Sequence, residues 1–178
     1  MRAARSTVAI VSLDGGPKVQ PRPGPFERVF MLSIGEEVAD PVSARMKAAE
    51  LARREQADWM IALTRDEDVA MDALELAAPA LSLYDAIFGS SHVRGSGEAV
   101  ARLSRLAFDE RERLPHALLH WWMPDAHLVR TDVAAQVLAR TSGHDANWKL
   151  DYLFDLWSAA RCLKSAQPHQ RAPSGARR

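Results

Sequence analysis

The sequence predicts an α/β protein of one domain, in which helices flank a mostly parallel sheet. Short apolar runs rich in β-branched residues alternate with segments of helical periodicity, and this alternation is typical of such a sheet. The length of 178 residues is that of one domain. With 47% apolar and 26% charged residues, the composition is globular and excludes a disordered chain, a collagen and a coiled coil.

The expected strands are short apolar runs that end at turn residues. The first, Thr-Val-Ala-Ile-Val-Ser-Leu, is closed by Asp14 and two glycines, and a loop rich in glycine and proline follows over residues 15–25. The second strand ends at Gly35, and an acidic loop follows the third directly. We expect strands at residues 7–13, 28–35, 58–63, 84–89 and 126–130.

The expected helices are marked by caps and by apolar residues at helical spacing. Asp40 followed by Pro41 is an N-cap with proline at the first helical position, and Thr131 is expected to cap a later helix. Residues 165–178 contain no acid, and we expect them to form a disordered basic tail behind a domain of residues 1–164. We expect helices at residues 41–56, 71–82, 97–113, 132–139 and 146–163, and a short helix or irregular segment at 114–122.

Charge and cysteine content narrow the class of protein. Lys plus Arg and Asp plus Glu both number 23, so the chain has no net charge, and we expect no nucleic-acid partner. The single Cys162 excludes an internal disulfide and a cysteine-based zinc site. No uncharged apolar stretch approaches the about 18 residues of a transmembrane helix. We therefore expect a cytoplasmic location, either free or at the periphery of a membrane.

The acidic loop after the third expected strand is the strongest chemical signal. Asp66, Glu67 and Asp68 follow an apolar strand, and ligands of parallel sheets bind beyond the carboxyl ends of the strands. Carboxylate oxygens on a short loop suit Mg²⁺ or Mn²⁺, so a metal site at Asp66 and Asp68 is one interpretation. The other is that these acids cap the helix that starts near Met71 and stabilise its positive end.

Two further groups of residues have both a chemical and a structural interpretation. His116 and His120 would share one helix face and could bind zinc with His127 and Asp125. Histidines four residues apart are, however, more often surface or half-buried side chains. The two tryptophans at 121–122 could stack on a sugar or a base, but packing in the core is their more frequent role.

The order of the segments resembles that of family-2 glycosyltransferases with the GT-A fold. Residues 57–75 resemble the family's apolar strand, its Asp-x-Asp metal motif and the helix that opens with Asp-Ala-Leu-Glu. Residues 41–49 resemble the preceding helix, and residues 127–131 resemble a later strand. Residues 146–150 fall where the family carries its catalytic base. The resemblance implies a GT-A-like fold that is shortened at its N-terminal side.

The resemblance also implies an activity, which is the transfer of a sugar from a nucleoside diphosphate sugar to an acceptor hydroxyl. Asp66, with Asp68, would hold Mg²⁺ or Mn²⁺ on the diphosphate. Arg45 would contact the phosphates, because a guanidinium binds two phosphate oxygens at once. Asp14 would contact the nucleoside, and Asp145 would serve as the general base.

Departures from the family's pattern support a second hypothesis. Without a gap, the first acid of the metal motif falls on Thr64, and the base falls on Asn147, an amide that cannot take up a proton. A helix and a strand are also missing, either before the first expected strand or after it. The alternative is a degenerate family member that binds a sugar nucleotide or a protein partner without catalysis. A third hypothesis is an interaction module in which the acids are helix caps.

Overall fold

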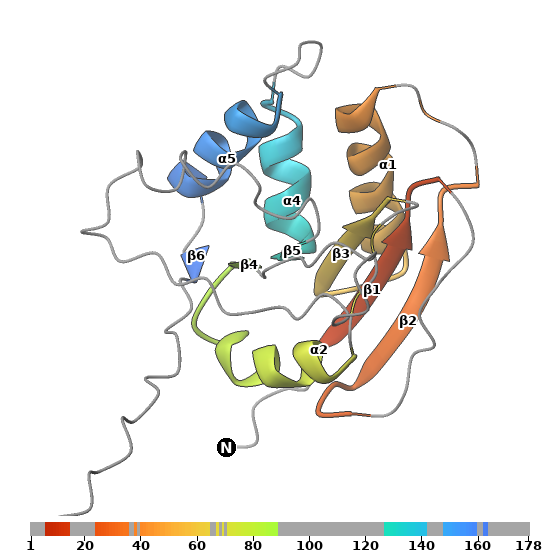
Figure 1. Cartoon of the computed structure of the whole chain (residues 1–178), viewed down its shortest axis with the longest axis vertical. Coiled ribbons are helices and arrows are strands. Elements are labelled where there is room, and N and C mark those ends of the chain that lie inside the picture. Colours follow the sequence, from red (N-terminus) through yellow and green to blue (C-terminus); the bar gives the residue numbers. More distant parts are fainter. Residues whose placement is uncertain are drawn as a thin grey trace, which may run out of the picture.

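The chain folds into a mixed sheet with helices on both faces. The computed structural model describes residues 6–14, 24–35, 38, 40–64, 67, 69, 71–88, 127–141, 148–159 and 162–163. The strands are β1 (Thr7–Ser12), β2 (Arg28–Ser33), β3 (Trp59–Leu63), β4 (Ala86–Phe88), β5 (His127–Arg130) and β6 (Cys162–Leu163). The helices are α1 (Pro41–Arg54), α2 (Met71–Ala77), α4 (Thr131–Leu138) and α5 (Trp148–Ala159), with a 3-10 turn η1 at Ala78–Ala80 (Figure 1).

The sheet is parallel around β1 and becomes mixed at β5. Its strand order over the described residues is β2-β1-β3-β5-β4-β6. Strand β1 pairs in parallel with β2 and β3, whereas β5 is antiparallel to both β3 and β4, and β6 is parallel to β4. The α/β class is confirmed, but the expectation of a mostly parallel sheet is wrong at β5. A short buried apolar run suits either pairing, so the sequence of β5 does not reveal its direction.

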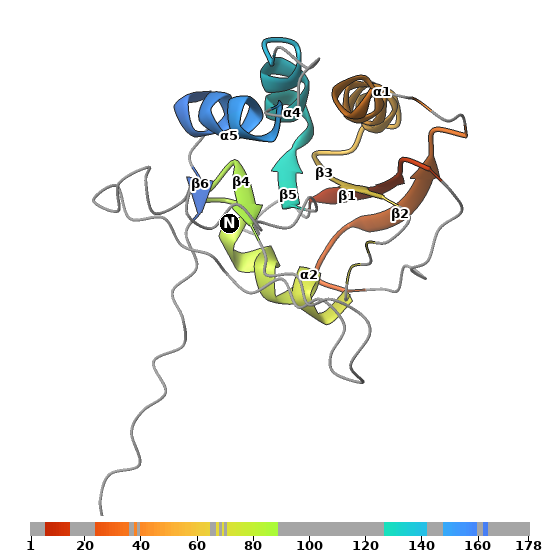
Figure 2. The ribbon, with the colours of Figure 1, turned by 45° about the horizontal axis from the view of Figure 1, so that its top comes forward.

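Both faces of β1 are buried, because helices cover the sheet on both sides. Val8, Ala9, Ile10 and Val11 are each 0% exposed. Ala9 and Val11 belong to the cluster formed with α1, α4 and α5, and Val8 and Ile10 belong to the cluster formed with α2. Figure 2 shows this division, with α1, α4 and α5 on one face of the sheet and α2 on the other. Strand β1 is therefore the centre of the hydrophobic core.

The start of α1 follows its local sequence, as expected. The carboxylate of Asp40 accepts hydrogen bonds from the N–H groups of Val42 at 3.4 Å and Ser43 at 2.8 Å. Pro41 occupies the first helical position, where no N–H donor is needed. The side chain of Asp40 thus caps the first turn of α1.

Three expected boundaries are wrong in ways that local chemistry explains. Helix α2 gives way to η1 at Ala78 because Pro79 lacks an N–H donor and clashes with the preceding turn. Helix α5 ends at Ala159, and residues 162–163 pair with β4 instead of extending the helix. Thr131 is the first residue of α4 rather than its cap, and its buried Oγ1 has no hydrogen-bond partner.

Several expectations fall outside the described residues. These are the helices at 97–113 and 114–122, the tail at 165–178, and most of the loop at 15–25. Among the helices that the structure describes, none has both the length and the apolar character needed to cross a bilayer.

The core position of α5 makes a direct prediction about stability. Leu156 is 0% exposed, so Leu156→Ala should lower the free energy of unfolding by about 2–5 kcal/mol through lost burial and a cavity. The matched control is Leu76→Ala, because Leu76 is 61% exposed and its truncation should change the free energy of unfolding little. Urea denaturation measures both. Equal losses in the two variants would contradict the placement of α5.

Candidate functional site

The carboxyl ends of β1, β2 and β3 lie together at one edge of the sheet. The N–H of Leu13 donates to the carbonyl of Leu63 at 2.8 Å, and the N–H of Ile34 donates to the carbonyl of Ser12 at 3.2 Å. These bonds continue the parallel pairing past the last strand residues. The chain continues from β1 to β2, which lies on one side of β1 in the sheet. From β3 it continues to β4, which lies on the other side. In open α/β sheets, ligands bind where two connections diverge in this way.

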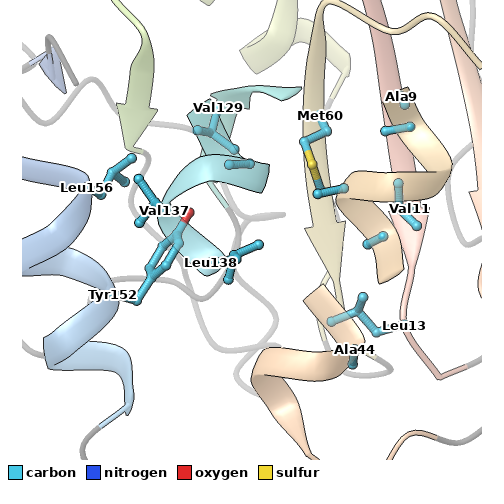
Figure 3. Packing of buried hydrophobic residues seen from close by; sticks show 14 of the residues in the cluster. Ala9, Val11, Leu13, Ala44, Met60, Val129, Val137, Leu138, Tyr152 and Leu156 are labelled. Carbon is cyan, nitrogen blue, oxygen red and sulfur yellow. The ribbon is translucent and has the colours of Figure 1, made fainter. Parts of the chain in front are cut away.

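Asp14 lies at this divergence, directly after β1. Its side chain is exposed, and no other described side chain lies within hydrogen-bond distance of its carboxylate. The residue before it, Leu13, is buried and packs in the same cluster as Ala44 of α1. Figure 3 shows these two side chains next to each other. The exposed carboxylate of Asp14 therefore follows a residue that packs against the N-terminal half of α1.

The end of β3 is closed by hydrogen bonds between Thr64 and Glu67. One carboxylate oxygen of Glu67 accepts from the N–H of Thr64 at 2.8 Å and from its hydroxyl at 2.9 Å. In return, the N–H of Glu67 donates to the carbonyl of Thr64 at 3.1 Å. Glu67 therefore caps the end of a strand, and not the helix that begins at Met71. The acid in the first turn of α2 is instead Asp72.

Arg45 lies on α1, one residue after Ala44, and is only 5% exposed. Its Cζ lies 4.6 Å from the centroid of the Trp148 ring, and its Nη1 donates to the carbonyl of Pro41 at 3.3 Å. Among the described residues no carboxylate forms an ion pair with it. Thr131 Oγ1 is the one described side-chain nitrogen or oxygen that is both buried and without a hydrogen-bond partner. The remaining N–H donors of Arg45 are therefore accessible to solvent. A largely buried cation of this kind favours an anionic ligand.

Helix α5 contacts the rest of the protein through residues spaced four apart. Trp148 stacks with Arg45, Tyr152 forms a 2.7 Å hydrogen bond with Nε2 of His127, and Leu156 is buried in the core. Residues at this spacing share one helix face, so a single face of α5 makes all three contacts. His127 pairs with Phe88, the last residue of β4, and so lies at the carboxyl edge as well. These contacts position the first turn of α5 beside Arg45.

The opposite edge of the sheet holds a separate polar group. Arg130 at the end of β5 lies 3.9 Å from a carboxylate oxygen of Asp85 and 3.3 Å from one of Asp132. The N–H of Thr7 donates to the carboxylate of Asp58 at 2.8 Å at the same edge. These contacts fix the entry of β1 and the turn from β5 into α4. They are remote from Asp14, since β5 runs antiparallel to β3.

Of the five residues predicted from the sequence, the structure describes two, Asp14 and Arg45, and the residues that precede them, Leu13 and Ala44, pack in one core cluster. The predicted metal ligands Asp66 and Asp68 and the predicted base Asp145 lie outside the described residues. In the part of the chain that is described, no three His, Cys, Asp or Glu side chains are placed to hold a metal ion. For the zinc hypothesis, His127 is bonded to Tyr152, and its three expected partners lie outside the described residues.

Sequence reasoning missed two features of this edge. The hydrogen bonds between Glu67 and Thr64 could not be predicted from the sequence, because the sequence does not show which acid of the loop turns back to the strand. The contact between Arg45 and Trp148 did have a signal, which is the spacing of Trp148, Tyr152 and Leu156 along one helix face. That spacing indicates a buried stripe but does not reveal which side chain lies opposite.

Comparison of the chain with models of protein families, with curated proteins and with solved structures finds no match in any of the three.

The hydrogen bond between Tyr152 and His127 should contribute measurably to the docking of α5. Tyr152→Phe removes the hydroxyl from a buried pair and should lower the free energy of unfolding by about 1 kcal/mol. Tyr84→Phe is the control, because Tyr84 is half-buried and its hydroxyl has no described partner. Chemical denaturation of both variants is the measurement. If Tyr152→Phe left the free energy of unfolding unchanged, this hydrogen bond would not stabilise the packing of α5.

Proposed function

We propose that this chain binds a nucleoside diphosphate sugar at the carboxyl edge of β1 and β3 and transfers the sugar to an acceptor hydroxyl. The observation that carries the proposal is that an exposed carboxylate, Asp14, follows β1, while a largely buried guanidinium, Arg45, lies on α1, whose Ala44 packs in the same cluster as Leu13. One group suits the hydroxyl and N–H donors of a nucleoside, and the other suits phosphate oxygens. A sugar nucleotide presents both kinds of group within one molecule.

The GT-A type of the sheet is part of this proposal. In doubly wound sheets the first strand lies in the centre and the chain winds outwards from it in both directions. Strand β1 has this central place between β2 and β3. Its position supports the register in which β1 is the first strand of the fold and the missing helix and strand follow it.

The proposed reaction is a displacement at the anomeric carbon of the sugar. The acceptor oxygen forms a bond to this carbon, while the bond from the carbon to the diphosphate oxygen breaks and its electron pair leaves with the diphosphate. The proton of the acceptor hydroxyl passes to a carboxylate, for which Asp145 is the proposed base. Arg45 offsets the negative charge that grows on the leaving diphosphate.

Mg²⁺ or Mn²⁺ bound by Asp66 and Asp68 remains a proposal that rests on the sequence resemblance. Among the described residues no three His, Cys, Asp or Glu side chains are placed to hold an ion, and one carboxylate oxygen of Glu67 accepts hydrogen bonds from Thr64. No step of the reaction is therefore assigned to a metal ion. The proposed location is cytoplasmic, either free or at the periphery of a membrane.

A non-catalytic function is the second candidate, and the Thr64–Glu67 contact favours it. Thr64 stands where the resemblance expects the first acid of the metal motif, and its N–H and hydroxyl are both committed to Glu67. This position therefore stabilises the end of β3 instead of offering a carboxylate. Such a chain would bind a sugar nucleotide, or a protein partner, without turnover.

Ligand binding can be tested by thermal stability. Nucleoside diphosphates should raise the melting temperature of the native chain, because a ligand that binds only the folded state stabilises it. Asp14→Ala should reduce this shift, and Asp66→Ala should abolish the part that depends on Mn²⁺. The control is Asp132→Ala, an exposed carboxylate at the opposite edge of the sheet. A native chain without any shift across the panel would overturn the proposed ligand class.

Catalysis can be tested by exchanging the two residues near the expected base. If Asp145 is the base, Asp145→Asn should lower the release of nucleoside diphosphate by roughly 10²–10⁴-fold, and Asn147→Asp should change little. If no base is present, Asn147→Asp should instead raise the rate. Assays of diphosphate release from several sugar nucleotides distinguish these outcomes. Absence of release from all three proteins, with nucleotide binding intact, would support the non-catalytic function.

A further inference from the structure

We infer that the chain forms a dimer in which β2 pairs with β2 of a second copy, antiparallel, so that the two sheets join. Strand β2 is the outermost described strand on its side of the sheet, and among the described strands it pairs with β1 alone (Figure 2). A strand in this place presents a row of backbone N–H and C=O groups, with which another extended chain can pair. The inference does not depend on the proposed function, because a dimer is measured without any ligand.

Alternate residues of β2 direct their backbone groups away from β1. The N–H of Ile34 donates to the carbonyl of Ser12 in β1 at 3.2 Å, so the backbone groups of the even-numbered residues face β1. The backbone groups of Val29, Met31 and Ser33 therefore face outwards. No described strand pairs with β2 on this outer side.

The outer side of β2 lacks the features by which proteins prevent such pairing, which are lysine, proline, bulges and very short strands. Its 6 residues pair with β1 in an unbroken register, so the strand has no bulge. Its one charged side chain, Arg28, donates to the carbonyl of Glu55 at 3.1 Å and lies 4.2 Å from the centroid of the Phe30 ring. That side chain therefore lies over the α1 face of the sheet. By contrast β6, the outermost described strand on the other side, has only 2 residues.

The outward backbone groups match those of a second β2 that runs in the opposite direction. With a two-fold axis at Met31, this residue lies opposite the partner's Met31, and Val29 lies opposite the partner's Ser33. Each outward residue then has an outward residue opposite it, and the two can exchange hydrogen bonds. Phe30 and Leu32 both pack on the cluster that includes α1. Each falls opposite the other in the partner, in the pairs where side chains approach most closely.

The distribution of charge favours this antiparallel arrangement. Residues 29–33 contain no charged side chain, so the centre of the contact brings no like charges together. Arg28 lies opposite the partner's Ile34, which places the two Arg28 residues about 20 Å apart along the strands at a rise of ~3.3 Å per residue. This separation exceeds the screening length of about 8 Å at physiological salt. The two guanidinium groups therefore do not oppose the dimer.

Both candidate sites stay open in this dimer. Because the paired β2 strands run in opposite directions, the carboxyl ends of β1 and β3 in one copy point away from those in the partner. A two-fold axis perpendicular to the sheet also keeps each face of the joined sheet the same, so α1 of both copies lies on one face. The exposed parts of the half-buried side chains of β2 become covered at the join.

The test is sedimentation velocity of the full chain over a range of concentrations, without ligand. The native chain should form a dimer, and Met31→Lys should raise its dissociation constant by roughly tenfold or more, because like charges then lie directly opposite each other. Met31→Pro should be monomeric, since it removes an outward N–H but no hydrogen bond to β1. Leu76→Lys is the matched control, because Leu76 is exposed on α2 and should leave the dimer intact. Melting curves show whether each variant is folded.

Cross-linking tests the register. In a chain that carries Cys162→Ser, Met31→Cys should form a disulfide between copies under mild oxidation. Opposite residues of a hydrogen-bonded pair have Cα atoms about 5.5 Å apart, which a disulfide can span. Leu76→Cys in the same chain is the control and should not cross-link.

Several outcomes would overturn the dimer. A native chain that is monomeric at every concentration would do so, and would leave this side of β2 to a strand of another protein. A dimer that persists in Met31→Lys, an equal loss in Leu76→Lys, and a disulfide at residue 76 but not at residue 31 would each do the same. If Met31→Pro does not fold, Met31→Lys still decides the result, because a lysine stem can lie along the strand while its ammonium group reaches water.

Discussion

The parallel pairing of β1 with β2 and β3 is the constraint on which the rest of the structure depends. Four consecutive residues of β1 are completely buried, so this strand has to be an interior strand of the sheet with helices on both faces. Its neighbours must then end at the same edge, which gathers the residues after β1 and β3 in one place. The location of the candidate site is thus a consequence of core packing.

The second requirement is that the side chain of Arg45 on α1 reaches Trp148 in the first turn of α5. Leu13 and Ala44 pack in one cluster and bring the first turns of α1 to the end of β1. The stacking of Arg45 on Trp148 and the bond from Tyr152 to His127 then fix α5 beside it. A cation is buried here without a described carboxylate partner, although burial of a charge is unfavourable unless it is paired. This imbalance is the physical reason to expect an anionic ligand.

Local sequence was a good guide to the elements and a poor guide to their directions. Asp40 and Pro41 predicted the start of α1, and the apolar runs predicted strands β1 to β5, because caps and periodicity are local properties. The antiparallel direction of β5 and the pairing of residues 162–163 with β4 depend on contacts distant in sequence. For the site, the alternation of strands and helices pointed to Asp14, because it directly follows a strand, whereas Arg45 was predicted only from the family resemblance. The bonding of Glu67 to Thr64 could not be foreseen, since nothing in the loop distinguishes one acid from the next.

The central claim is that this edge binds a nucleoside diphosphate, and amide NMR spectra of the labelled chain test it most directly. On titration with a nucleoside diphosphate, the largest chemical-shift changes should fall on the amides of Leu13, Asp14, Arg45 and Thr64. The amide signals of Arg130 and Asp132, at the opposite edge, should not shift. Changes centred on Arg130 and Asp132, or no changes at saturating ligand, would contradict the account.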